Sequence, residues 1–81
     1  MWFVYILKCE DGSFYTGSTN NPDRRFLEHK NKKGGHYTSS HKVVERIYLE
    51  ECETQSMALK RERQIKGWRR GKKLKLTNLS I

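Results

Sequence analysis

The sequence predicts an α+β fold: a small three-stranded antiparallel β-sheet flanked by helices. Three observations support this class. Residues 2–18 contain two runs rich in β-branched and aromatic residues around an Asp-Gly turn, which is a strong hairpin signal. Residues 43–51 alternate as a further strand would, and two helix-start signals occur near residues 21 and 54. A chain of 81 residues is sufficient for one domain, residues 1–81, with one small core.

The first hairpin is predicted to close through a three-residue loop, residues 10–12. This loop is a type I turn ended by Gly12 in the left-handed region, where glycine has no steric cost. In this register Tyr5 lies opposite Gly17, and Tyr5 and Tyr15 project from the same face. The missing side chain of Gly17 leaves room beside Tyr5. A two-residue loop would put the tyrosines on opposite faces, and we favour the longer loop.

A helix is predicted to begin at Asn20-Asn21-Pro22-Asp23 and to run from Pro22 to Lys30 or Asn31. Asparagine serves as an N-cap, proline fits the first helical position, and an aspartate suits the positive end of the helix dipole.

Two side chains of this helix are candidates for a site. Arg25 and His29 are i,i+4 neighbours, next to Phe26 and away from Glu28. If Phe26 anchors the helix to the sheet, Arg25 and His29 lie at the rim of that contact. The alternatives are a solvated arginine and a histidine favoured only by the negative end of the helix dipole.

Residues 31–42 are predicted to form a loop, because glycines, hydroxyl-bearing residues and basic residues are interleaved there without apolar periodicity. Its candidate phosphate ligands are Lys32, Lys33, His36, Ser39, Ser40 and Lys42. Tyr37 is available to stack on a base. The alternative is an ordinary solvated loop.

The next strand is predicted over Val43–Glu51, with Val43, Glu45, Ile47 and Leu49 on one face. Thr54 then caps a second helix from Gln55 to Gly67. Its inner side is predicted to carry Ala58, Leu59 and Ile65, extended by Met57 and Trp68.

Glu62 points toward the apolar side of this second helix. A carboxylate in that position needs a partner, a proton or a metal. A partly buried salt bridge is the structural alternative to a metal site. Arg61 also falls within the apolar arc and can pair with a nearby acid.

The end of the chain carries its densest basic run. Trp68 is followed by Arg69, Arg70, Lys72 and Lys73. This run is a candidate phosphate contact, although such runs are often plain solvated termini. The leucines that follow predict a short final helix or strand folded back on the core.

Composition limits the classes of partner. Seventeen Lys and Arg against nine Asp and Glu leave a net charge of +8, which favours an anionic partner such as nucleic acid. No apolar run approaches the roughly 20 residues of a membrane helix, and no signal peptide is recognisable. Cys9 and Cys52 lack metal-ligand spacing. We expect buried, reduced thiols in a cytoplasmic protein, with a lone disulfide as the alternative.

The segments Val4-Tyr5 and Tyr15-Thr16-Gly17 resemble the paired motifs of the GIY-YIG nuclease superfamily, in particular its small stand-alone bacterial members. The resemblance extends over roughly residues 2–70. Phe3 occupies the position of the glycine in the GIY motif, and Thr16 occupies the position of the isoleucine in the YIG motif. Arg24-Arg25-Phe26-x-x-His29 resembles the family's arginine-bearing helix, and Glu62-Arg63-Gln64-Ile65-Lys66 resembles its glutamate-bearing helix.

The resemblance implies roles for these side chains. Glu62 binds a metal ion, Mg²⁺ or Mn²⁺, and Arg25 steadies the scissile phosphate. Tyr5 acts as a base or positions the nucleophile, with Tyr15 and His29 in support. The chain lacks the clustered aspartates of two-metal nucleases. One carboxylate suits a single Mg²⁺ that keeps most of its water.

Three hypotheses for function follow. The first is a metal-dependent endonuclease that hydrolyses phosphodiester bonds in DNA, with DNA repair or recombination as its setting. The second is a nucleic-acid-binding module of the same fold with little or no activity. The third, an RNA-associated factor, rests on charge alone. A protein partner that supplies specificity is compatible with each.

Overall fold

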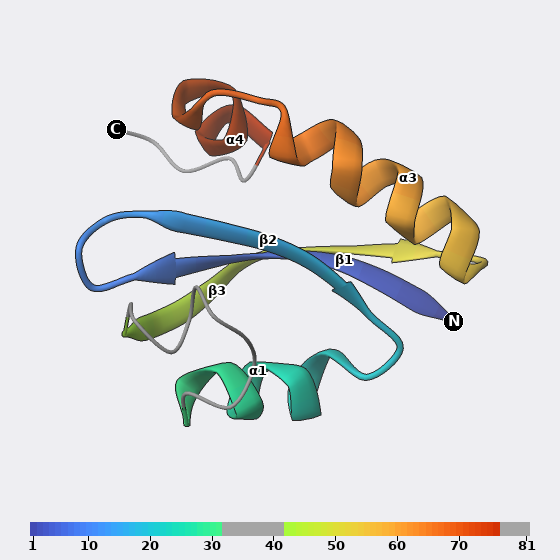
Figure 1. Ribbon diagram of the computed structural model, residues 1–81, viewed down its shortest axis with the longest axis horizontal. Helices are drawn as coiled ribbons and strands as arrows, with labels where there is room; N and C mark the ends of the chain where they lie inside the picture. The colour runs from blue at the N-terminus through green and yellow to red at the C-terminus, as the bar shows by residue number, and fades with distance from the viewer. Residues whose placement is uncertain (32–41, 77–81) are drawn as a thin grey trace.

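The computed structural model describes residues 1–31 and 42–76. Its elements are β1 (Trp2–Cys9), β2 (Phe14–Thr19), α1 (Pro22–Lys30), β3 (Val43–Cys52), α3 (Gln55–Lys66) and α4 (Arg70–Leu76). The strands form one antiparallel sheet in the order β2-β1-β3. Helix α1 covers one face, and α3 and α4 lie on the other (Figure 1). The predicted α+β class with a three-stranded antiparallel sheet is therefore confirmed.

The central strand, β1, separates two small cores. Val4 and Ile6 are fully buried in a cluster with Ala58 and Ile65 of α3. The alternate residues of β1, including Leu7, are buried in a second cluster with Phe26 of α1. Because helices cover both faces, β1 is apolar on both sides instead of alternating with polar residues.

The hairpin has the predicted register. Gly12 has φ of 85°, and its N–H donates to the carbonyl of Cys9 at 2.9 Å. The N–H of Cys9 donates to the carbonyl of Ser13 at 2.9 Å, which closes the three-residue loop. Tyr5 pairs with Gly17 across the two strands.

Strand β3 corrects the prediction of regular alternation. It pairs with β1 as expected, but its register shifts between Ile6 and Leu7 and again between Lys8 and Cys9. Ile47 and Tyr48 consequently pack against the same cluster instead of opposite faces. Leu49, predicted to share the face of Ile47, is 40% exposed. An extra residue in one strand leaves the pairing interrupted and changes which side chains face the core.

Both predicted N-caps are present. The side chain of Asn21 accepts from the N–H of Arg24 at 3.1 Å, and that of Thr54 accepts from the N–H of Met57 at 3.2 Å. The inner side predicted for the second helix is too broad, because the side chains of Met57 and Leu59 are 51% and 44% exposed. Its buried residues, Ala58 and Ile65, pack in the core cluster beside the sheet. The described part of the final segment, up to Leu76, is a helix, α4, rather than a strand.

Cys9 and Cys52 are free and buried, as expected for reduced thiols. They belong to different clusters, on opposite faces of the sheet. Within residues 1–31 and 42–76, no helix has the length and apolar character needed to cross a membrane. The predicted phosphate ligands of the long loop, Lys32, Lys33, His36, Ser39 and Ser40, lie outside the described residues, as does Tyr37.

Candidate active site

The two tyrosines lie on the same face of the sheet, as the hairpin register predicted. Tyr5 and Tyr15 have ring centroids 6.3 Å apart. His29 of α1 packs against both, with centroid distances of 5.8 Å to Tyr5 and 5.0 Å to Tyr15. The three rings form a cluster between β2 and α1.

His29 corrects the expectation that it would lie at a rim, because it is 0% exposed. Its Nε2 lies 2.9 Å from the hydroxyl of Tyr5, and this hydrogen bond satisfies both buried groups. Phe26, one helical turn earlier, packs against the same core as Tyr5. Phe26 and His29 lie on the same side of α1 and together hold this helix closely against the sheet, which leaves the imidazole buried.

Burial keeps both groups neutral near pH 7. It raises the pKa of Tyr5 to about 12, despite a hydrogen bond from Arg25 that lowers it. Burial, with the charge of Arg25, lowers the pKa of His29 to about 4. The imidazole tautomer with its proton on Nδ1 can accept the phenol proton at Nε2. Tyr5 is therefore a phenol whose proton has an acceptor already in place.

Arg25 joins this pair from the solvent side. Burial lowers the pKa of its guanidinium, but hydrogen bonds to Tyr5 and Glu28 outweigh that effect and raise it. Arg25 Nη1 lies 3.2 Å from Glu28 Oε1, which corrects the prediction that the two side chains diverge. An i,i+3 pair is within reach on a helix surface. The arginine side chain remains 35% exposed, so its fork is accessible to a phosphate.

Gly17 makes the position of Tyr5 feasible. A Cβ placed on Gly17 would come within 2.6 Å of Tyr5 Cζ and closer still to the hydroxyl. The phenol therefore passes directly over the backbone of β2, an edge strand. The sequence prediction that Gly17 leaves room beside Tyr5 is confirmed.

Glu62 approaches the same edge strand from α3, on the opposite side of the sheet. Its carboxylate is 17% exposed and accepts from Ser18 Oγ of β2 at 2.6 Å through Oε1. Its Oε2 lies 2.8 Å from Lys66 Nζ. The negative charge of Glu62 contributes to the raised pKa of Tyr5, which places the two groups in one electrostatic environment. The groups of the site therefore lie on both faces of the sheet, along the edge strand β2.

Sequence reasoning missed two members of this site, Ser18 and Lys66. Lys66 stands four residues after Glu62, so helical spacing could have identified it as an ion-pair partner. Ser18 had no signal of its own. Its proximity to Glu62 depends on how α3 crosses β2.

The donors at Glu62 fit a hydrated Mg²⁺ or Mn²⁺. Within the described residues, no group of three or more His, Cys, Asp or Glu could hold a metal ion. One carboxylate and the Ser18 hydroxyl are hard oxygen donors, suited to a cation that retains several waters. The donor set does not fit a zinc site, which requires several nitrogen or sulfur ligands.

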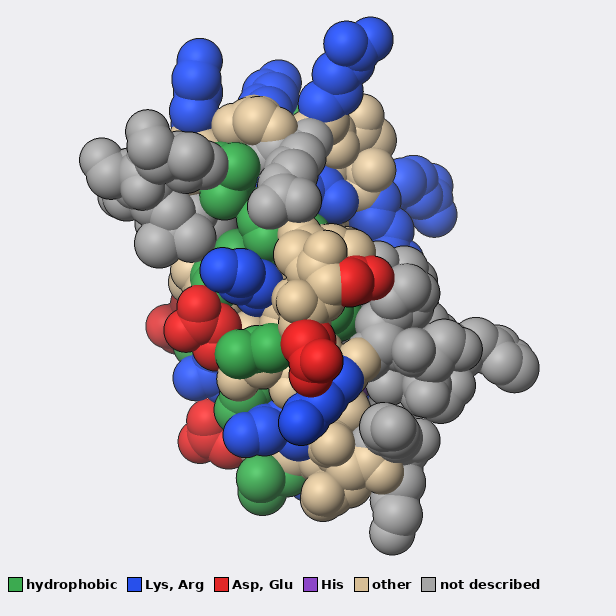
Figure 2. All heavy atoms as spheres, turned by 90° about the vertical axis from the view of Figure 1, so that its left-hand side faces the viewer, with side chains coloured by type: hydrophobic (Ala, Val, Ile, Leu, Met, Phe, Trp, Pro, Cys, Tyr) green, Lys and Arg blue, Asp and Glu red, His purple; other side chains and the backbone are tan. Residues whose placement is uncertain are grey.

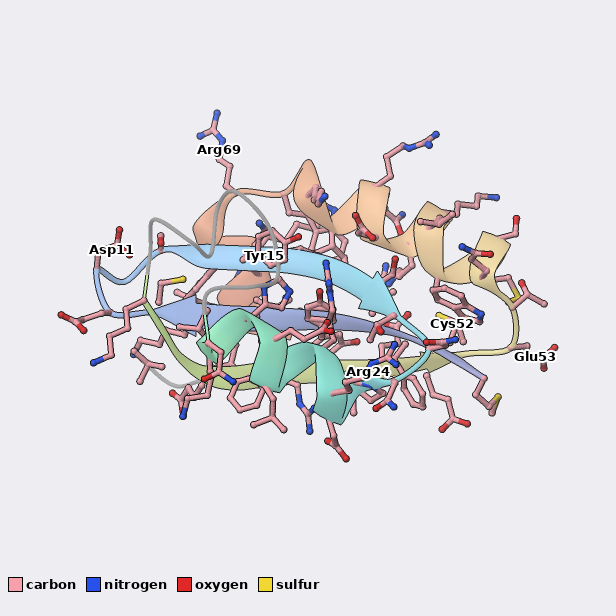
Figure 3. The ribbon with its side chains drawn as sticks, turned by 60° about the horizontal axis from the view of Figure 1, so that its bottom comes forward. Asp11, Tyr15, Arg24, Cys52, Glu53 and Arg69 are labelled. Carbon is pink, nitrogen blue, oxygen red and sulfur yellow. The ribbon has the colours of Figure 1, made fainter. Side chains whose placement is uncertain are left out.

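The predicted basic run lies around the start of α4. Figure 2 shows Lys and Arg side chains without acidic neighbours at the top of one face of the molecule, while lower on this face Lys and Arg lie among Asp and Glu. Arg69 is exposed and extends outward (Figure 3). Lys72 Nζ lies 4.4 Å from the centroid of the Trp68 ring, and Lys73 is only partly exposed. Arg70 is the first residue of α4.

One further predicted contact, Lys42, directly precedes β3. It is exposed and its Nζ is 3.8 Å from Glu10 Oε2, near the hairpin loop. The predicted phosphate contacts that the structure describes therefore lie on two elements of the chain, around α4 and directly before β3. The catalytic candidates Tyr5, Tyr15, Arg25, His29 and Glu62, in contrast, converge on β2.

The fold and site define a nuclease-type catalytic domain: residues 1–75 match the model of the GIY-YIG catalytic domain, and the chain belongs to this family. It is 46% identical over 74 residues to a UPF0213 protein of Staphylococcus saprophyticus, covering 91% of this chain and 90% of the relative. A UPF0213 protein of Staphylococcus epidermidis is 49% identical over the same coverage. The solution structure of a Bacillus halodurans UPF0213 protein is 34% identical, with a TM-score of 0.57, and the match covers 99% of this chain and 86% of that one.

Proposed function

We propose that this protein is a metal-dependent endonuclease that hydrolyses phosphodiester bonds in DNA. The main support is the convergence on one strand edge of a buried phenol, its proton acceptor, an arginine and a carboxylate. Tyr5 and His29 share a hydrogen bond of 2.9 Å, and Arg25 contacts the same phenol. Glu62 approaches from the other helix. Membership of a nuclease family and a net charge of +8 are consistent with a nucleic-acid substrate.

The Tyr5 phenol and the His29 imidazole have different roles in this proposal. A phenol with a pKa of about 12 is a poor base at neutral pH when it acts alone. Tyr5 donates its hydroxyl proton in a hydrogen bond to His29 Nε2, which leaves a lone pair of Tyr5 Oη free to accept a hydrogen bond from the attacking water and orient it. Arg25, which also hydrogen-bonds to Tyr5, helps to hold the phenol in this orientation. Tyr15 holds the imidazole by ring contact.

Arg25 has a second role toward the substrate. Its guanidinium offers donors that match a phosphate, and it is already held in place by Glu28 and Tyr5. Preorganised donors of this kind stabilise the charge that develops on the phosphate oxygens. Glu62 would hold Mg²⁺ or Mn²⁺, which when bound supplies Lewis-acid stabilisation of the same charge.

The second candidate is a nucleic-acid-binding module with little activity. It is favoured by the contacts of both Glu62 oxygens with Ser18 and Lys66, because a metal must share the carboxylate with these partners or displace one of them. In either case the basic residues around α4, including Arg69 and Lys72, would contact phosphates. DNA repair or recombination in the cytoplasm is the setting we propose.

The decisive experiment is a cleavage assay with Mg²⁺ and Mn²⁺ over single-stranded, duplex, flap and junction DNA, with RNA as a further substrate. Glu62→Gln should abolish cleavage while DNA affinity stays the same or rises, because the change removes a negative charge. Glu51→Gln is the matched control, since Glu51 is an exposed acid of β3. Binding without cleavage by the unaltered protein under every metal would favour the module.

A further inference from the structure

Lys66 has two contacts at the edge of the site. Its Nζ lies 2.8 Å from Glu62 Oε2, and 6.0 Å from the ring centroid of Tyr15. The other carboxylate oxygen of Glu62 accepts from Ser18. Each oxygen of the carboxylate therefore has one internal partner, a neutral hydroxyl on one side and a cation on the other.

We propose that Lys66 is an exchangeable counter-ion of Glu62, which holds the carboxylate oxygen that a divalent cation takes and so competes with that cation. This inference rests on the proposed metal site at Glu62. In this role Lys66 is a positioning residue: it keeps the carboxylate aimed at the β2 edge until the metal replaces it. It also sets how much metal is needed to fill the site.

The structure indicates which of the two partners gives way. The Ser18 hydroxyl belongs to β2, whose backbone is fixed by its pairing with β1. The Lys66 side chain is 50% exposed and has a flexible four-carbon stem. An ammonium ion released from Glu62 remains beside the face of Tyr15, which is favourable for a cation. A metal can therefore replace Lys66 without disturbing the sheet.

Charge gives a further reason for the competition. A divalent cation and an ammonium ion at one carboxylate repel each other, so binding of one weakens binding of the other. The cost of displacing Lys66 is that of a partly exposed ion pair, about 0.2–1 kcal/mol, which corresponds to about 1.4- to 5-fold in affinity. Removing the ammonium ion should therefore tighten metal binding by that factor.

The test is a titration of the full-length protein with Mn²⁺, in which free Mn²⁺ is followed by its electron paramagnetic resonance signal at constant ionic strength. Lys66→Met should lower the dissociation constant for Mn²⁺ by about 1.4- to 5-fold. Lys66→Arg, which keeps the charge, should stay near the unaltered protein. Lys60→Met is the matched control: it removes the same charge from an exposed position of α3 and should change the constant far less.

The double variant Glu62→Gln with Lys66→Met separates this inference from the proposed function. In the Glu62→Gln background, the change at Lys66 should have no effect on Mn²⁺ binding. If Glu62→Gln alone leaves Mn²⁺ affinity unchanged, the proposed metal ligand is wrong, and with it the role of Lys66. If Glu62→Gln weakens binding but Lys66→Met does not tighten it, only the inference about Lys66 is overturned. Thermal unfolding of each variant checks that the fold is retained.

Discussion

The hydroxyl of Tyr5 lies directly over the backbone of Gly17, where a side chain of even one carbon would overlap the phenol. The two residues are paired across β1 and β2. This contact allows a side chain from the central strand to reach the edge strand. There it hydrogen-bonds to Arg25 and His29 of α1 and is influenced by the negative charge of Glu62 of α3.

Gly17→Ala should therefore displace Tyr5 and damage activity more than the fold. Overpacking of this kind costs about 1–3 kcal/mol of stability. The displaced phenol loses its aligned hydrogen bond to His29 and no longer orients the water, so cleavage should fall about 10²-fold, as expected for a misplacement of about 1 Å in a catalytic arrangement. Gly71→Ala is the control, because nothing lies within 4 Å of a Cβ added to this residue of α4. Denaturant unfolding and cleavage kinetics measure the two effects, and equal behaviour of the variants would contradict the prediction.

His29 should make the protein acid-sensitive. Its pKa falls from 6.5 to about 4 on folding, so the unfolded chain binds a proton that the folded protein excludes. The stabilisation is complete above about pH 6.5 and is lost as the pH falls toward 4, by up to about 3 kcal/mol. Urea unfolding at a series of pH values measures this loss. His29→Gln should be less stable near neutral pH but should show a smaller change between pH 6.5 and 4, and an unchanged slope would exclude His29 as the cause.

Arg25 should contribute to catalysis rather than to stability alone. Arg25→Ala should lower the cleavage rate by about 10²–10³, by analogy with the loss of one preorganised donor. Arg25→Lys keeps the charge but not the planar fork, so it should restore the rate only in part. The neighbouring Arg24 is exposed and provides the control, because its alanine variant removes the same charge. A similar loss in both alanine variants would indicate diffuse electrostatics instead of a phosphate contact.

The basic residues around α4 should bind phosphates, which a salt titration tests. Each duplex phosphate neutralised contributes about −0.9 to the slope of log affinity against log salt. Replacing both Arg69 and Lys72 by alanine should flatten the slope by up to about 2 units and weaken all sequences alike. The control replaces Lys60 and Arg63, two exposed bases of α3, and should change the slope less. An unchanged slope after loss of Arg69 and Lys72 would show that these residues are only solvated.

The sequence alone determined the elements and the hairpin register. Asp11-Gly12 and the β-branched runs are local signals, and a one-residue error in register would have reversed every side chain. The caps at Asn21 and Thr54 are equally local, because each side chain bonds its own helix start. The hairpin signals placed Tyr5 and Tyr15 on one face.

Only the tertiary structure decided what surrounds those tyrosines. The hydrogen bonds of the site join residues that are distant in sequence: Tyr5 and His29 are 24 positions apart, and Ser18 and Glu62 are 44 positions apart. No local sequence pattern specifies how closely two helices approach a sheet. The sequence therefore left His29 at a rim, although the close packing of α1 buries it and shifts its pKa. Burial and electrostatic coupling arise from the whole assembly of elements, and these properties determine which side chains can transfer a proton.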